Sequence, residues 1–194
     1  MTQRKIDPQG KKEAVLKEAL RLFVERGYHR VSIPDIVRAS GVSTGAIYNQ
    51  FSNKEELARQ VHFQTLNDFQ ERFFERMVHA ATTFEKLRAF AGLVFEIAES
   101  EPVMMEYMLS MRHVEFLPDS LPLCYSDAFR WVQQIVAEGI ARGELKQGDH
   151  LLSAVSFTGV VLRAVELRLA GVIKVSLLDA GDELVENAWA AVRA

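Results

Sequence analysis

Apolar residues recur along almost the whole chain at intervals of three and four positions, the spacing of one face of an α-helix. Such a stripe lies between about residue 11 and residue 26, and its members are Val15, Leu16, Ala19, Leu22 and Phe23. The same periodicity continues after residue 53, without a long strand-like alternation and without an Asn-Gly hairpin turn. The pattern therefore predicts an all-α fold.

Residues 31–51 have the pattern of two short helices joined by a glycine turn. Ser32 and Asp35 stand three residues apart, so each can bond the other's backbone amide at the start of the first helix. Gly41 supplies the left-handed conformation that lets the chain reverse at low steric cost. Ser43 is a natural cap for the second helix. The arrangement is that of a helix-turn-helix, which lays its second helix in a DNA groove.

The second of these helices has two unlike sides. Its apolar side is formed by Val42, Ala46, Ile47 and Phe51. Its other side carries small or uncharged hydrogen-bonding residues, namely Thr44, Gly45, Tyr48, Asn49 and Gln50. Glycine permits close approach to a nucleic acid, and Asn and Gln can pair with adenine edges. An ordinary helical corner with a glycine has some of these features, so the local pattern alone leaves both interpretations open.

The flanking sequence favours the DNA-binding interpretation. Two short helices bury too little surface to hold their shape alone, and the apolar stripe upstream and a capped helix starting at Asn53 supply the missing support. The runs that carry the resemblance are Ala19–Tyr28, the segment capped by Ser32, Ser40–Tyr48 and Phe51–Leu57. Together they resemble the amino-terminal domain of TetR (tetracycline repressor) family transcription regulators, over about residues 11 to 60.

The resemblance implies roles for individual residues. In that family the helix corresponding to residues 44–50 enters the major groove, and the residues matching Ser32, Tyr48 and Lys54 contact phosphate. The predicted DNA-binding residues are Ser32, Ser43, Thr44, Gly45, Ala46, Tyr48, Asn49, Gln50 and Lys54. Asn49 and Gln50 occupy positions that vary within the family, so the base sequence stays open.

The rest of the chain divides into further helices. Predicted helices follow Asn53 and Thr82, start at Pro102 and run to about Glu115, and span residues 127–141 and 150–170, with a last one opened by Ser176. About nine helices result, which agrees with the resemblance. We expect a three-helix DNA-binding domain over residues 1–55 and a larger helical domain for ligand binding and dimerisation over residues 56–194.

The last two predicted helices carry stripes of small and apolar residues that could pack against helices of a second copy. Periodicity alone favours closure of a monomeric core, whereas the resemblance implies a homodimer formed by a four-helix face. The residues expected at this face are Leu152, Val155, Gly159, Val160, Arg163, Leu167, Leu184, Ala188 and Trp189. A two-fold dimer presents two reading helices about one DNA turn apart, so the operator should be an inverted repeat.

The middle of the chain is rich in methionine and aromatic residues, which suit an apolar pocket. Taken singly, each is more often a core residue than a ligand contact. The candidates for a ligand site are Phe90, Phe95, Met104, Met108, Met111, Tyr125 and Phe129. By resemblance, a small hydrophobic or aromatic effector binds there and releases the protein, a repressor, from its operator.

Composition and charge fit this division. The chain of 194 residues has a net charge of −3. Residues 1–60 hold 11 Lys and Arg against 7 Asp and Glu, a difference of +4, and the remainder holds 12 against 19, a difference of −7. A positive head orients the protein toward DNA by one end. A single cysteine, no long uncharged apolar run and a polar start predict a cytoplasmic protein without a membrane segment.

The sequence contains no motif typical of a catalytic site. The five histidines are scattered, and the chain lacks H-E-x-x-H, C-x-x-C and phosphate-loop sequences, so we expect no enzyme activity and no cofactor. His113, Glu115 and Cys124 are the one set that suggests a metal, but such residues are far more often hydrogen-bonded bystanders, and we predict no metal. The alternative function is a dimeric architectural DNA-binding protein without an inducer.

Overall fold

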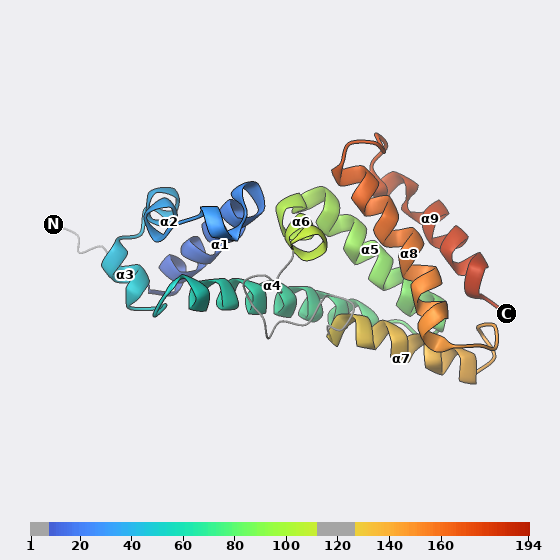
Figure 1. Ribbon diagram of the computed structural model, residues 1–194. Coiled ribbons are helices and arrows are strands. Elements are labelled where there is room, and N and C mark those ends of the chain that lie inside the picture. The colour runs from blue at the N-terminus through green and yellow to red at the C-terminus, as the bar shows by residue number, and fades with distance from the viewer. Residues whose placement is uncertain (1–7, 112–126) are drawn as a thin grey trace. The chain divides into compact units, whose positions relative to one another are not determined.

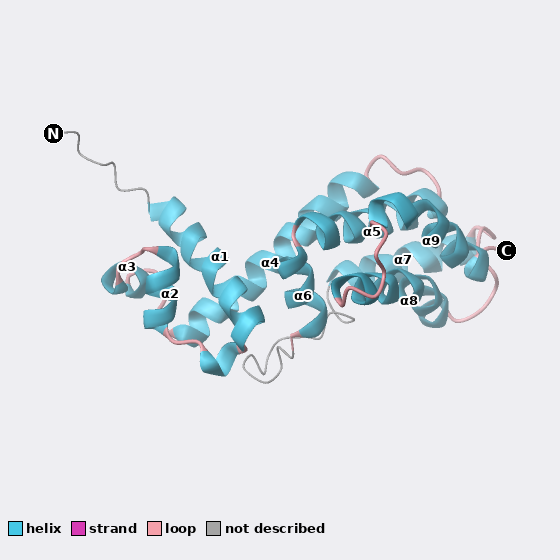
Figure 2. Ribbon diagram, turned by 90° about the horizontal axis from the view of Figure 1, so that it is seen from above, coloured by secondary structure: helices cyan, strands magenta, loops and turns pink. Residues whose placement is uncertain are grey.

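The computed structural model describes residues 8–111 and 127–194. Over these residues it contains nine α-helices and a short 3-10 helix, with no strand beyond an isolated bridge between Leu145 and Arg193 (Figure 2). The elements are α1 (Pro8–Arg26), η1 (Tyr28–Arg30), α2 (Ile33–Ser40), α3 (Thr44–Tyr48), α4 (Lys54–Met77), α5 (Thr83–Ser100), α6 (Pro102–Ser110), α7 (Asp127–Ala141), α8 (His150–Leu169) and α9 (Leu177–Val192) (Figure 1). The predicted all-α fold is confirmed.

The described residues form two compact units. The first holds residues 8–65 and 110–111, and the second holds residues 66–109 and 127–194. The sequence placed the domain boundary at residues 55 and 56, where α4 begins, whereas the structural division lies after Thr65. The difference arises because Leu57, Ala58 and Val61, on the first turns of α4, are at most 2% exposed and belong to the core of the first unit.

The first unit is built on the apolar stripe of α1. All five predicted stripe residues are buried. The helix is described from Pro8, three residues before the predicted start. It ends as predicted at Arg26, and Gly27 follows with a positive φ of 79°.

The second unit is organised around α5. This helix contacts α7, α8 and α9, and it buries Leu87, Ala91, Leu93 and Ile97 completely. Thr82 caps it and forms a reciprocal capping pair with Glu85. The helices α8 and α9 lie side by side as an antiparallel hairpin (Figure 1).

The bounds of α7 agree with the prediction, whereas those of α6 do not. The helix α7 has the predicted bounds, Asp127–Ala141. The helix α6 ends at Ser110, and Met111 is already non-helical, whereas the sequence extended it to about Glu115, which lies outside the described residues.

The helix α8 has the predicted length, to within one residue at its end, and it is strongly apolar. By length and composition it is the one helix in the described residues that could cross a membrane. Its apolar character has a simpler cause, because Ala154, Phe157, Val161 and Val165 lie in the core of the second unit. We therefore treat α8 as a core helix.

A carboxylate joins three helices of the second unit. Glu99, near the end of α5, accepts bonds from the guanidinium of Arg168 on α8, with Nε at 2.8 Å and Nη2 at 3.0 Å. It also accepts a bond of 2.8 Å from the backbone amide of Leu177, the first residue of α9. The Arg168 guanidinium and the amide lower the pKa of Glu99 to about 2. This contact fixes the α8–α9 hairpin against α5.

Candidate nucleic-acid interface

The start of α2 is closed by the predicted capping box. The hydroxyl of Ser32 accepts a bond from the Asp35 amide at 3.3 Å, and the Asp35 carboxylate accepts one from the Ser32 amide at 2.9 Å. A bond from the Ser32 hydroxyl, joined by the charge of Arg38, holds the pKa of the Asp35 carboxyl below its ordinary value. Ser32 itself remains exposed at the surface of the unit.

The turn between α2 and α3 has the predicted chemistry. Gly41 adopts a left-handed conformation with a φ of 68°. Ser43 caps α3 by accepting a bond of 3.4 Å from the Ala46 amide. The helix ends at Tyr48 rather than continuing to Gln50, because the Gln50 amide bonds the carbonyl three residues back and so tightens the last turn.

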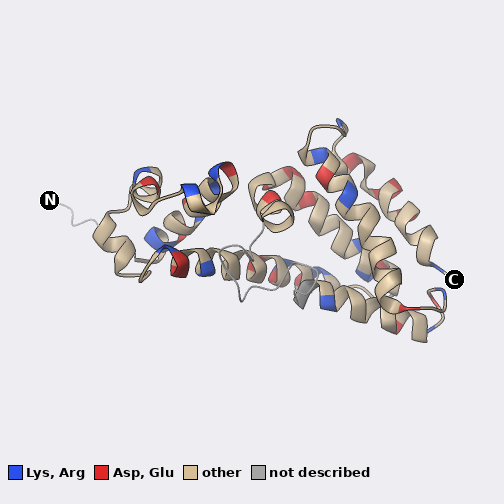
Figure 3. Ribbon diagram, in the orientation of Figure 1, with Lys and Arg blue, Asp and Glu red and all other residues tan. Residues whose placement is uncertain are grey.

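The two sides of α3 are separated as the sequence predicts. Val42, Ile47 and Phe51 are 7%, 1% and 1% exposed and face the core of the unit. On the other side Thr44, Gly45, Tyr48 and Asn49 are exposed and Gln50 is half-buried, and the cap residue Ser43 is exposed as well. Ala46, which the sequence placed on the apolar side, is only half-buried. Figure 3 shows no charged residue on α3. The outer side is thus a polar, neutral surface.

Gly45 lies exposed on this surface. A Cβ atom built at this residue would meet no other atom within 4 Å. Gly45 is therefore not required by packing within the unit. Its small size matters only for something that approaches from outside.

Gln50 is partly committed inside the protein. Its side-chain amide donates a bond of 3.2 Å to the carbonyl oxygen of Pro8, at the start of α1. Its amide oxygen is left as an acceptor. Contact of Gln50 with a base stays a prediction.

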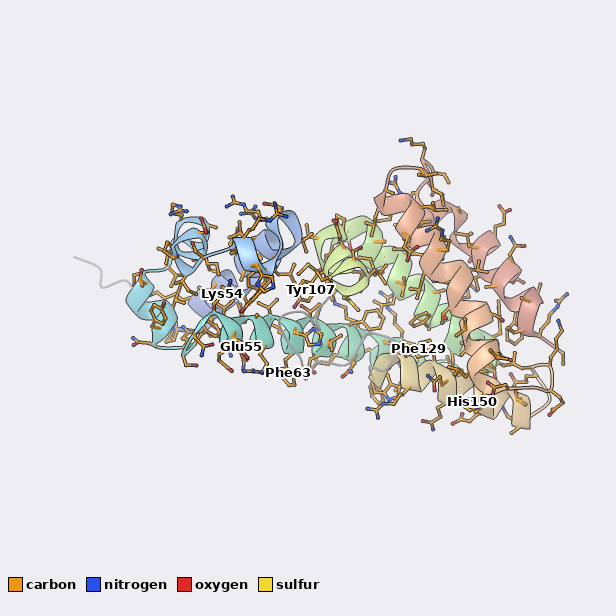
Figure 4. The ribbon with its side chains drawn as sticks, viewed as in Figure 1. Lys54, Glu55, Phe63, Tyr107, Phe129 and His150 are labelled. Carbon is orange, nitrogen blue, oxygen red and sulfur yellow. The ribbon has the colours of Figure 1, made fainter. Side chains whose placement is uncertain are left out.

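Lys54 has a structural role that the sequence did not reveal. Its ammonium group donates to the carbonyl oxygens of Tyr28 and Val31, each at 3.0 Å, and lies 4.0 Å from the centre of the Tyr28 ring (Figure 4). Partial burial lowers the pKa of this lysine. The group ties the first turn of α4 to the segment that leads into α2. Its predicted contact with phosphate is not tested by these bonds.

Most predicted ligand residues meet in the second unit. Phe90, Phe95, Met104 and Met108 are 2% to 8% exposed and belong to one buried cluster. Tyr107, which is 1% exposed, lies on the same helix as the two methionines (Figure 4). Of the other candidates, Met111 and Phe129 are half-buried, and Tyr125 lies outside the described residues.

The predicted dimer residues fall into two groups. Those on one side of α8 are open to solvent: Leu152 is 67% exposed and Val155 is 49% exposed, and Gly159 and Arg163 are exposed as well. Val160, Leu167, Leu184 and Trp189 are half-buried, and Ala188 is fully buried. The ring of Trp189 lies 5.2 Å from that of Phe84, so it packs within the protomer.

No group of three or more His, Cys, Asp or Glu side chains suited to a metal occurs in the residues that the structure describes. His113, Glu115 and Cys124 lie outside them.

The fold and the interface define a helix-turn-helix DNA-binding protein with a separate helical body. Residues 15–61 match the family model of bacterial regulatory proteins, tetR family. The fatty acid metabolism regulator protein of Bacillus subtilis (strain 168) is 26% identical over 137 residues, which cover 69% of this chain and 70% of that protein. The chain is a TetR family transcriptional regulator, a member of a family of non-enzymes.

Solved structures share the fold over most of the chain. The transcriptional regulator FadR from Bacillus subtilis, in complex with stearoyl-CoA, superposes with a TM-score of 0.73 at 24% identity, over 91% of this chain and 96% of that one. AibR, in complex with isovaleryl coenzyme A and operator DNA, superposes with a TM-score of 0.66 at 22% identity, over 80% and 86% of the two chains.

Proposed function

We propose that this chain is a dimeric repressor that binds an inverted-repeat operator and is released by an effector with a substantial apolar part. The observation that carries the DNA-binding half is the outer side of α3, where Thr44, Gly45, Tyr48 and Asn49 are exposed although no packing within the unit uses them. A structure of a relative with operator DNA supports the same half.

The polar groups on and beside this surface have chemical partners on DNA. Asn49 and the free oxygen of Gln50 face bases, and Gly45 lets the backbone of α3 approach the groove floor. Ser32, Ser43, Thr44 and Tyr48 supply hydroxyls to phosphates. Lys54 contributes positive charge near the start of α4, and the excess of four positive charges over residues 1–60 directs this end of the chain to the polyanion.

The effector proposal rests on the buried cluster of the second unit. Methionine adapts to varied ligand shapes, and the phenylalanines of α5 supply flat apolar contact area. The two relatives with stearoyl-CoA and isovaleryl coenzyme A support an acyl group as the apolar part. Phe90, Phe95, Met104 and Met108 are the residues proposed to contact it.

The helix α4 is the proposed link between effector and operator. It is continuous from Lys54 to Met77, and it contributes buried residues to both units: Leu57 to the first and Phe73 to the second. An effector that prefers one orientation of α4 changes the spacing of the two reading helices in the dimer. A preference of about 1.4 kcal/mol changes operator affinity tenfold. Such a regulator acts where the chromosome is, in the bacterial cytoplasm.

Selection of bound sequences from random DNA duplexes tests the first half of the proposal. We expect enrichment of an inverted repeat. Loss of this enrichment with the Tyr48→Ala variant would show that the sequence preference depends on α3. Failure to enrich any sequence at low salt would overturn the assignment.

Stearoyl-CoA and isovaleryl coenzyme A are then titrated against the selected duplex, with free coenzyme A as the control. Release by an acyl form and not by free coenzyme A supports the effector. An acyl-CoA that binds the protein without changing DNA affinity favours the architectural alternative.

A further inference from the structure

The arginines of the first unit are mostly neutralised inside it. Their ion pairs join Arg21 to Glu18 and Glu25, Arg26 and Arg38 to Asp35, and Arg59 to Glu55 and Glu56. A carboxylate this close offsets much of the positive charge that the arginine presents to a second anion. Among the described residues of this unit, Arg30 is the arginine without an ion pair, and it is exposed. It belongs to η1, which leads into α2 rather than into α3.

The three lysines of α1 stand in different surroundings. Lys12 is half-buried, and it is close enough to Glu56, on the first turn of α4, for its charge to act on that carboxyl. Lys11 and Lys17 are exposed, and neither lies within ion-pair distance of a carboxylate in the described part of the chain. These two lysines therefore present their full charge to the solvent and to any anion that approaches α1.

The start of α1 lies beside the end of α3 (Figure 1). The bond that shows this is the one of 3.2 Å from the side-chain amide of Gln50 to the carbonyl oxygen of Pro8. Lys11 follows Pro8 by three positions, which is about 4.5 Å along the helix axis, and residues three apart are neighbours on a helix surface. The buried stripe of α1, which begins at Val15, holds the helix in this place, so the position of Lys11 does not depend on Gln50.

Lys11 is thereby, among the described residues, the exposed and unpaired cation that the fold brings next to the reading helix. Lys17 lies nine positions after Pro8, which is about 13.5 Å along the axis of α1. Two phosphate backbones border the major groove, which is about 12 Å wide, so a helix inserted there has phosphates on either side. A cation beside the end of α3 then lies next to one of these backbones.

We propose that Lys11 binds a phosphate of the operator at the edge of the major groove that receives α3. Its ammonium group is a compact charge on a flexible stem, which suits a contact that carries no sequence information. The contact ties the start of α1 to the DNA backbone and so helps to fix how the end of α3 enters the groove. The inference rests on the DNA binding of the proposed function, and it adds a contact from a helix outside the helix-turn-helix.

The salt dependence of DNA binding by the full-length protein tests this contact. Fluorescence anisotropy measures the affinity for the selected duplex and for a scrambled duplex between about 50 and 200 mM salt. For Lys11→Ala we expect the slope of log affinity against log salt to become shallower by about 0.9 for each bound copy, which is a loss of roughly fivefold in affinity per copy near 0.15 M salt. Both duplexes should lose the same factor, because a phosphate is present in each.

Two further variants serve as controls. Lys11→Arg keeps the charge, so it should keep the slope of the wild type. Lys17→Ala is the matched control, because it removes the same exposed and unpaired charge from the same helix at a place farther from α3; its slope should equal that of the wild type. Circular dichroism should give all three variants the melting temperature of the wild type, because both lysines are exposed.

The outcomes separate the inference from the proposed function. A shallower slope for Lys11→Ala, with Lys17→Ala unchanged, supports the phosphate contact. Equal slopes for Lys11→Ala and the wild type overturn it, and so does an equal fall for Lys11→Ala and Lys17→Ala, which would be an effect of net charge alone. A changed preference for the selected over the scrambled duplex overturns the assignment to a phosphate. A wild type that binds no duplex overturns both the inference and the proposed function.

Discussion

The substitution Glu99→Gln measures how strongly the contact among α5, α8 and α9 stabilises the second unit. The carboxylate accepts two bonds from Arg168 and one from the Leu177 amide, and its side chain is 17% exposed. A pKa of about 2, against an ordinary value of 4.5, corresponds at about 1.4 kcal/mol per pKa unit to roughly 3 kcal/mol as an upper limit. Glutamine keeps an oxygen for the Leu177 amide, so we expect a loss of about 2 kcal/mol.

The pH dependence of this loss follows from the direction of the pKa shift. The pKa of Glu99 is lower in the folded state than in the unfolded chain, so its stabilisation is complete above about pH 4.5 and is lost as the pH falls toward 2. Urea unfolding of wild type and Glu99→Gln at pH 7 and pH 3 measures it. The difference in the free energy of unfolding should at least halve at pH 3.

The matched control is Glu96→Gln, one turn earlier on α5. Glu96 pairs with Arg76 at 2.7 Å, but 47% of its side chain is exposed, so this loss should stay below about 1 kcal/mol. Equal losses for the two variants, or a difference for Glu99→Gln that is the same at both pH values, would refute the reasoning.

Further predictions concern the first unit. Gly45→Ala should raise the stability of that unit by up to about 1 kcal/mol, because alanine favours helix and a Cβ meets open space, yet it should weaken operator binding in a gel-shift assay; unchanged binding would show that DNA does not approach this residue. Tyr48→Ala should weaken operator binding and leave the melting temperature unchanged, because the side chain is 51% exposed; a lowered melting temperature would contradict this. Lys54→Ala should instead lower the stability by about 1 to 2 kcal/mol, because it leaves the carbonyls of Tyr28 and Val31 without this donor, and thermal unfolding of the variant beside Tyr48→Ala separates the two roles.

The sequence predicted the features that depend on neighbouring residues. The capping pair of Ser32 and Asp35, the left-handed Gly41 and the bounds of α7 each depend on residues a few positions apart, and all are present. The end of α3 at Tyr48 was not foreseen, because the local pattern does not show that the Gln50 amide bonds the carbonyl of the third preceding residue, Ile47.

The sequence could not predict contacts between residues that lie far apart along the chain. Glu99 and Arg168 are 69 positions apart, and Lys54 lies 26 positions after Tyr28, so no periodicity relates them. Lys54 shows the consequence for the candidate site. The resemblance implied a phosphate contact, and the fold adds two carbonyl partners that no motif indicates.

The stretch from residue 39 to residue 53, which includes α3, contains no Lys, Arg, His, Asp or Glu. Cations that neutralise the phosphates therefore come from other parts of the protein. Ionic strength will set how tightly the protein holds any duplex, while the ranking of one duplex over another is set by groups that carry no charge. Exchanging residues 44–50 with those of a relative should accordingly retarget the regulator without altering its response to salt.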